Sequence, residues 1–173
     1  MKRSDIGQLP PFYDTYINQV EDIEILRALE NYDALMDDES LQKCNMLGDT
    51  VYQEGKWTVR DIFQHIIDTE RIMAYRALRF ARNDKTVLAG FDENLFGAEM
   101  QSKHKSVNTL AIEFNLLRRA NTMMFKEFKH EILRRKGFVN QTEISVLALG
   151  FVLVGHQKHH TRVIKEKYFP IID

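Results

Sequence analysis

One cysteine, three prolines and no long apolar run are the first features that limit what this chain of 173 residues can be. The single cysteine, Cys44, excludes a disulfide within the chain and is typical of a reducing compartment. The longest apolar stretch, 146–155, is too short to span a bilayer. Residues 1–8 include two basic residues with no apolar run behind them, so no signal peptide is predicted. We therefore expect a cytoplasmic protein with a free thiol and no membrane partner.

An excess of charge of either sign is also absent. The formal net charge is −1, and 44% hydrophobic with 28% charged residues is an ordinary composition for a globular domain. Such a balance offers no general attraction for nucleic acid, and we expect none as a partner. The length suits one hydrophobic core, and neither a linker nor an internal repeat divides it. The sequence therefore predicts a single domain over residues 1–173.

Convincing β-strand alternation is missing, and apolar residues recur instead at every third or fourth position, which indicates amphipathic α-helices. These patterns predict four helices, at 12–36, 59–81, 107–135 and 142–170. We expect a polar, non-helical connection between the first two. Four helices of this length without strands predict an all-α fold, a four-helix bundle.

Local signals mark where these helices begin and end. Thr58 stands three residues before Asp61, a spacing at which a capping hydroxyl accepts from the third backbone N–H and an acidic residue favours the positive helix end. Gly137 suits a stop after the third helix, and Thr142 suits the start of the fourth. The segment 83–105 lacks a helical period, and we expect at most a short helical turn in it, near 91–96.

Three of the six histidines fall within five positions near the C-terminus. His156 and His160 are four residues apart, which places them one turn apart on the same helix face. His159 points about 100° away from His160, so it is a candidate for a supporting shell rather than a ligand. His65, in the second predicted helix, would complete a catalytic type of metal site with one open position if the two helices face each other. The alternative is that all these histidines are ordinary core or surface residues.

Two familiar metal motifs do not fit these residues. The zinc-protease motif requires a glutamate directly after its first histidine, where this chain has Gln157. A ferritin-like di-iron site requires two Glu-x-x-His pairs, and only Glu127 with His130 matches. We expect that pair to lie on a solvated helix face, and His104 to lie on the surface.

Carboxylates near these histidines are candidates for a supporting shell around a metal. Asp68 follows His65 by three residues and could orient its ring, or it could pair with Arg71 at the helix surface. Asp92 and Glu93 lie in the irregular segment, where active-site loops often occur. The alternative for these two is that they only keep the loop solvated.

Three blocks of this sequence resemble the DinB/YfiT-like superfamily. They are GKWTVRDIFQHIIDTER at 55–71, AGFDE at 89–93 and VGHQKHH at 154–160, in the order and spacing of that family. The resemblance runs across most of the chain. It implies a four-helix bundle, often a homodimer, with one divalent metal ion held by three histidines. Carried over by motif, these ligands are His65, His156 and His160.

The resemblance implies a metal-dependent enzyme acting on a small molecule. Some members look like transferases that activate a low-molecular-weight thiol such as bacillithiol, and this is our first expectation. The alternatives are a hydrolase, in which the metal activates water, and a non-catalytic stress-associated protein that binds metal. Zinc and nickel are the ions we expect first. Gln157-Lys158 stands where many relatives have Glu-Leu, which puts in doubt any role for an acidic base at that position.

Overall fold

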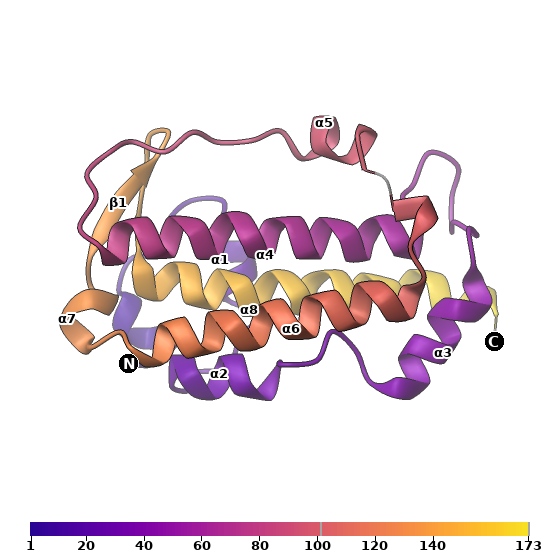
Figure 1. Cartoon of the computed structure of the whole chain (residues 1–173), viewed down its shortest axis with the longest axis horizontal. Coiled ribbons are helices and arrows are strands. Elements are labelled where there is room, and N and C mark those ends of the chain that lie inside the picture. Colours follow the sequence, from indigo (N-terminus) through magenta and orange to yellow (C-terminus); the bar gives the residue numbers. More distant parts are fainter. Residues whose placement is uncertain (101, 173) are drawn as a thin grey trace.

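The computed structural model describes residues 1–100 and 102–172. Three long helices form its frame: α4 (Val59–Ala81), α6 (Val107–Lys126) and α8 (Val146–Val163) run side by side (Figure 1). Helix α4 packs against both α6 and α8. The predicted all-α fold is confirmed.

Two short helices occupy the fourth helix position of the bundle. Helix α1 (Asp14–Ile17) packs on α8, and α2 (Ile25–Asn31) packs on both α6 and α8. Because α2 thus lies opposite α4, the four positions close around a common interior, as in a four-helix bundle. The first helical pattern in the sequence, at 12–36, therefore does not correspond to one continuous helix.

The prediction of one continuous helix at 12–36 is wrong, because contacts with the N-terminal segment interrupt the helix. The short 3₁₀ turn Arg3–Ile6 lies beside residues 22–25, where the backbone N–H of Ile25 donates to the Met1 carbonyl at 3.0 Å. The backbone N–H of Ser4 donates to Asp22 at 2.8 Å. These long-range bonds hold the chain extended at Glu24, so the helix restarts at Ile25 instead of continuing.

The connection predicted to lack a helix contains one, α3 (Asp38–Leu47). Its N-terminus is capped by Asp37, whose carboxylate accepts from the backbone N–H of Ser40 at 2.8 Å. Cys44 and Leu47 are buried on its inner face. An N-cap aspartate followed by apolar residues three apart is a signal that the sequence did contain.

The second predicted helix corresponds to α4, and its capping prediction is confirmed. The Thr58 hydroxyl accepts from the backbone N–H of Asp61 at 3.2 Å, and the Thr58 N–H donates to the Asp61 carboxylate at 2.9 Å. The third predicted helix ends sooner than expected. Helix α6 stops at Lys126, and the short helix α7 (His130–Leu133) follows after a turn in which the Phe128 N–H bonds the carbonyl of Phe125.

A β-hairpin lies where the sequence predicted no strand. Strands β1 (Lys136–Val139) and β2 (Thr142–Ser145) are antiparallel, with Gly137 opposite Ile144. Gly137 is therefore not a helix stop, and a Cβ at this position would overlap the ring of Phe80. Thr142 does not cap the last helix either; Ser145 does, because its hydroxyl accepts from the backbone N–H of Ala148 at 3.1 Å.

A long strap, described over residues 82–100 and 102–106, returns over α4 (Figure 1). It contains α5 (Glu93–Ala98), close to the expected helical turn, and the 3₁₀ turn Ser102–His104. Leu88 in the strap exchanges backbone hydrogen bonds with β1 and its turn, at 2.9 Å each. At the other end of the chain, α8 continues as a π-helical turn, Ile164–Tyr168, and a 3₁₀ turn, Phe169–Ile171. Among the described residues, no helix is long and apolar enough to cross a membrane.

The core consists of two apolar clusters with a polar layer between them. One cluster includes Phe80, Phe125 and Phe151, and the other includes Phe63 and Phe114. Between them along the three long helices lie buried polar side chains: Glu70, Arg118, Asn121, His156 and Gln157. Burial of so many polar groups at one level is costly unless they bond one another or a ligand. We therefore expect the functional site to lie in this polar layer.

Candidate metal centre

The three predicted ligand histidines converge in the polar layer. His65 on α4 lies opposite His156 and His160 on α8, and one ring nitrogen from each lies within 4.8 Å of those of the others. The Nε2 atoms of His65 and His156 are 3.0 Å apart. Within the described chain, no fourth histidine, cysteine, aspartate or glutamate belongs to this group. The juxtaposition depends on the packing of α4 against α8, which meets the condition that these two helices face each other.

This arrangement fits a metal ion better than a hydrogen-bonded cluster. Imidazole nitrogens about 2.0–2.1 Å from a tetrahedral zinc ion lie roughly 3.3 Å apart, close to the separation of His65 and His156. A proton shared between those two nitrogens would satisfy that pair alone. It would leave Nε2 of His160, which is buried and has no hydrogen-bond partner, without any interaction. One ion among the three nitrogens satisfies all of them.

The histidines are held in the neutral form that binds metals. Burial lowers the pKa of His65 to about 4 and that of His160 to about 3. Burial also holds the pKa of His156 well below its ordinary value, and the neighbouring His160 and His65 add to this effect. Neutral imidazoles need not release a proton before they coordinate an ion.

Aromatic rings pack around the three histidines. The indole of Trp57, just before α4, lies 5.0 Å from the ring of His65. On the other side, the ring of Tyr16 from α1 lies 5.1 Å from that of His156. Gly155 allows this approach, because a Cβ there would overlap the backbone carbonyl of Tyr16. Contacts from α1 and from the residue before α4 thus restrict how the ligand rings can turn.

A buried ion pair fixes α4 to α6 just beyond the histidines, and the sequence did not reveal it. Arg118, with no exposed surface, donates from Nε and Nη2 to the two carboxylate oxygens of Glu70, at 2.8 and 2.9 Å. It also donates to the carbonyl of Leu153 on α8 at 3.0 Å. Asn121 donates to the same Glu70 carboxylate at 2.9 Å. Because bidentate geometry is directional, this network sets the spacing of the three long helices at the level of the site.

The candidate centre opens toward a cavity of about 940 Å³. His156 is part of its wall, together with Thr69 and Arg76 of α4 and Glu93 of the strap. The remaining lining residues come from the segment around α1, the strap, the hairpin and the long helices: Phe12, Tyr13, Tyr16, Met73, Gly90, Phe91, Val139, Asn140, Gln141, Thr142 and Val152. A cavity of this size holds a small organic molecule, and it gives such a molecule access to one of the three histidines.

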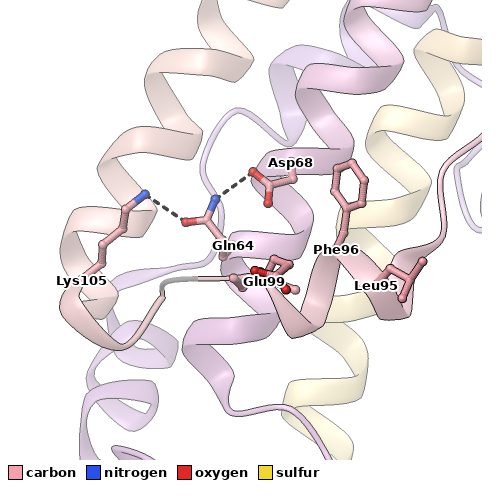
Figure 2. Close-up of a pocket in the computed structure, with 7 residues that line it drawn as sticks. Gln64, Asp68, Leu95, Phe96, Glu99 and Lys105 are labelled. Carbon is pink, nitrogen blue, oxygen red and sulfur yellow. Dashed lines mark hydrogen bonds between the residues drawn. The ribbon is translucent and has the colours of Figure 1, made fainter.

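The structure places Asp68 on the outer side of α4. Figure 2 shows Gln64 between Asp68 and Lys105: it donates to Asp68 at 2.8 Å and accepts from Lys105 at 2.9 Å. Arg71 lies 3.5 Å from the Asp68 carboxylate, the pairing that we considered as the alternative. Gln64, Asp68 and Lys105 border a second hollow of about 620 Å³, together with Leu95 and Phe96 of α5.

The other candidates for a supporting shell lie in different surroundings. Asp92 caps α5, because its carboxylate accepts from the backbone N–H groups of Asn94 and Leu95 at 2.8 and 3.1 Å. Glu93 lines the cavity, and partial burial together with the neighbouring Asp92 raises the pKa of its carboxyl. The Nδ1 atom of His159 lies 3.3 Å from Nε2 of Gln19, and its ring packs on Tyr16. Of these residues, Glu93 alone lines the cavity beside His156.

Known proteins share both the sequence pattern and the fold of this chain. The pattern that defines the DinB superfamily matches residues 26–164. A protein of Oceanobacillus iheyensis named "Putative metal-dependent hydrolase OB0413" is 26% identical over 161 residues, which are 84% of this chain and 85% of the relative.

A solved structure shows the same fold. YfiT from Bacillus subtilis, described as a probable metal-dependent hydrolase with an unusual four-helix bundle topology, has a TM-score of 0.64 at 21% identity. The likeness covers 92% of this chain and 87% of that one, and it agrees with the four-helix bundle predicted here. The superfamily pattern extends over all three long helices and all three converging histidines. The chain therefore belongs to the DinB superfamily.

Proposed function

We propose that this chain is a metal-dependent hydrolase in which His65, His156 and His160 hold one divalent ion beside the substrate cavity. The observation that carries the proposal is the buried, unpartnered Nε2 of His160 within a group of three neutral imidazoles, one of which lines a cavity of about 940 Å³. The two relatives, one named a "putative" and the other described as a "probable" metal-dependent hydrolase, support the reaction class. A divalent ion with an open position lowers the pKa of a bound water or thiol.

The chain's own residues would hold the substrate and move protons. In hydrolysis, the oxygen of water adds to an electrophilic carbon, and the bond from that carbon to its leaving group breaks. Glu93 can accept the proton from water and return it to the leaving group, because its raised pKa brings the carboxyl closer to neutral pH. Tyr13, Tyr16 and Met73 form part of the wall that would exclude bulk water from the reacting groups.

A thiol S-transferase is the second candidate, and it is the function that the sequence resemblance favoured. The cavity is large enough for a low-molecular-weight thiol beside an electrophilic substrate. In that reaction the thiol sulfur forms the new bond to carbon, and the leaving group departs with the thiol proton. Both candidates use the same three histidines and differ in the nucleophile.

A non-catalytic metal site is the third possibility, and the surroundings of the histidines argue against it. Structural zinc sites are closed by four protein ligands, whereas three histidine, cysteine or carboxylate groups converge here in the described part of the chain. His156 moreover lines the cavity. Three protein ligands and an adjacent cavity are the features of a catalytic site.

We also propose which metal ion is bound, how many copies of the chain assemble and where in the cell the protein is located. Zinc and nickel both accept three imidazole ligands and are the first ions to test. We propose a cytoplasmic homodimer, as the family resemblance implied. The outer face of α6 supports a second copy, since Ile112, Leu116 and Met123 are all exposed there at helical spacing. Light scattering of the purified protein measures the assembly directly.

The metal is tested first, by elemental mass spectrometry on untagged protein. Wild-type protein is compared with His156→Ala and with His130→Ala, whose histidine is exposed on α7. We expect one equivalent of metal in wild type and in His130→Ala, and at least a tenfold loss in His156→Ala. If wild-type protein takes up neither zinc nor nickel, the proposed function is wrong.

The nucleophile is tested with metal-loaded protein on a panel of esters and amides. Hydrolysis predicts turnover without added thiol, and incorporation of isotopic oxygen from labelled water into the product. S-transfer predicts that turnover requires a thiol such as bacillithiol and that the product carries its sulfur. The variant Glu93→Gln should reduce turnover in either case while leaving the metal content unchanged.

A further inference from the structure

A second buried arginine, Arg76, lies in the substrate cavity without an anionic partner. Its side chain is 4% exposed and forms part of the cavity wall that His156 also lines. We propose that Arg76 binds a carboxylate on the substrate, so that the cavity selects small organic acids. This inference rests on the proposed function, since it assigns the cavity to the substrate.

The contacts of Arg76 leave its charge unmatched. It donates to the carbonyl of Ala89 at 2.9 Å, and its Nη1 lies 3.4 Å from both the Tyr13 hydroxyl and the Met73 sulfur. All three of these partners are neutral. Across the described residues, no carboxylate lies within ion-pairing distance of Arg76, and Glu93 lines the same cavity without pairing with it.

Arg118 differs from Arg76, because its buried charge is paired with a carboxylate inside the fold. Arg118 donates to both carboxylate oxygens of Glu70, to two backbone carbonyls and to the side-chain oxygen of Gln157. A buried guanidinium is costly without a negative partner, and Arg118 has one inside the fold. Arg76 borders a cavity instead, so a partner can come from a bound molecule.

The cavity has a second unsatisfied polar group on the same helix. The hydroxyl of Thr69 is buried without a hydrogen-bond partner, and Thr69 lines the cavity. At about 1.5 Å of rise per residue, the Cα of Thr69 lies roughly 6 Å beyond that of His65, and the Cα of Arg76 lies roughly 16 Å beyond it. Thr69 thus stands between the candidate metal centre and Arg76.

The rest of the cavity wall is largely apolar, which indicates that the body of the ligand is apolar as well. Phe12, Met73, Phe91 and Val152 contribute apolar surface, and the Arg76 guanidinium lies 5.7 Å from the centre of the Phe91 ring. A molecule that matches this wall has an apolar body, a carboxylate at Arg76 and a reacting group nearer His156. Carboxylate recognition by arginine also has the geometric specificity that an apolar cavity by itself lacks.

The test is a calorimetric titration of hexanoate against hexanamide, which differ in charge but hardly in size. Wild-type protein is titrated both metal-free and zinc-loaded, with metal content measured on the same samples. We expect hexanoate to bind about 10- to 100-fold more tightly than hexanamide, the range for hydrogen bonds to a charged group. In Arg76→Met this preference should fall below about twofold, and Arg76→Lys should retain part of it.

Arg79→Met is the matched control, because Arg79 is on the same helix, pairs with Asp84 and does not line the cavity. It should keep the full preference for hexanoate. Equal binding of the two probes to wild-type protein, no binding of hexanoate, or an unchanged preference in Arg76→Met would each overturn the inference. Equal binding of the two probes to wild-type protein that carries its full metal content rejects the carboxylate subsite alone. Failure to take up metal with the preference intact rejects the proposed hydrolase alone.

Discussion

The guanidinium of Arg118 donates to the amide oxygen of Gln157 at 2.9 Å. The amide nitrogen of Gln157 in turn donates to the carbonyls of Ala34 and Leu35, at 2.7 and 3.2 Å. Gln157 therefore points away from the cavity side of α8, into the polar layer, although it directly follows His156. A carboxylate at this position could accept from Arg118 but could not donate to the two carbonyls. Gln157, at the position where the family resemblance implied a glutamate, thus has a structural role here.

We predict that Gln157→Glu lowers the free energy of unfolding by about 2–3 kcal/mol, because two buried carbonyls lose their donor and face a carboxylate. Metal content should be unchanged, since the ligands remain in place. Urea denaturation measures the effect. Gln42→Glu introduces the same charge at an exposed position of α3 and should change stability by less than about 0.5 kcal/mol. Equal stability of Gln157→Glu and wild type would contradict this role.

The contact between Gly155 and Tyr16 leads to a second prediction. In Gly155→Ala the new methyl group would overlap a backbone carbonyl, so α1 must shift away from α8. We expect a loss of about 1–3 kcal/mol in stability and weaker metal binding, because Tyr16 packs on His156. Gly150→Ala is the comparison, since its neighbours are the side chains of Phe125 and Ile25, which can move. A larger effect on metal affinity from Gly150→Ala would refute the explanation.

The lowered pKa values of the histidines predict how stability depends on pH. In the metal-free fold His65 and His160 take up protons near pH 4 and 3, whereas in the unfolded chain they do so near 6.5. Between these values the unfolded state binds more protons, so folding is favoured above pH 6.5 and weakens as the pH falls toward 4. Each histidine contributes up to about 1.4 kcal/mol per pH unit.

The measurement is urea denaturation of metal-free protein at pH 7.5, 6 and 5. The free energy of unfolding should decrease with falling pH, and the slope should be shallower in His65→Phe, which lacks one of the titrating groups. Metal affinity, in contrast, should stay nearly constant from pH 8 to 5, because the buried ligands are already neutral. A steep loss of affinity just below pH 6.5 would show that the histidines titrate as ordinary ones.

Cys44 should be unreactive in the folded protein. Its thiol is completely buried in α3, and burial raises its pKa to about 12, so almost no thiolate is present at neutral pH. We expect Ellman's reagent to modify Cys44 at least 100-fold more slowly in buffer than in concentrated urea. Similar rates in the two solutions would mean that α3 opens readily. The result also decides whether Cys44 could interfere in assays that add a thiol.

Local spacing predicted much of the candidate site. His156 and His160 are four residues apart on a helix, and that relation holds wherever the helix packs. The capping pair Thr58 and Asp61 is equally local, and so is the start of α4. Prediction failed where distant segments intervened. Bonds from Met1 and Ser4 to residues 22–25 divided the first helix, and the close contact of Gly137 with Phe80 belongs to a hairpin rather than to a helix end.

The sequence by itself determined the helical class, the number of candidate ligands and which of them share a helix face, because these depend on a period of about 3.6 residues. Tertiary structure alone decided that His65 meets His156 at 3.0 Å, that Arg118 finds Glu70, and that Arg76 faces a cavity. The two pairings, and the wall of the cavity, join residues far apart in the chain. They form only when burial of two apolar clusters brings the helices together, which no local pattern encodes.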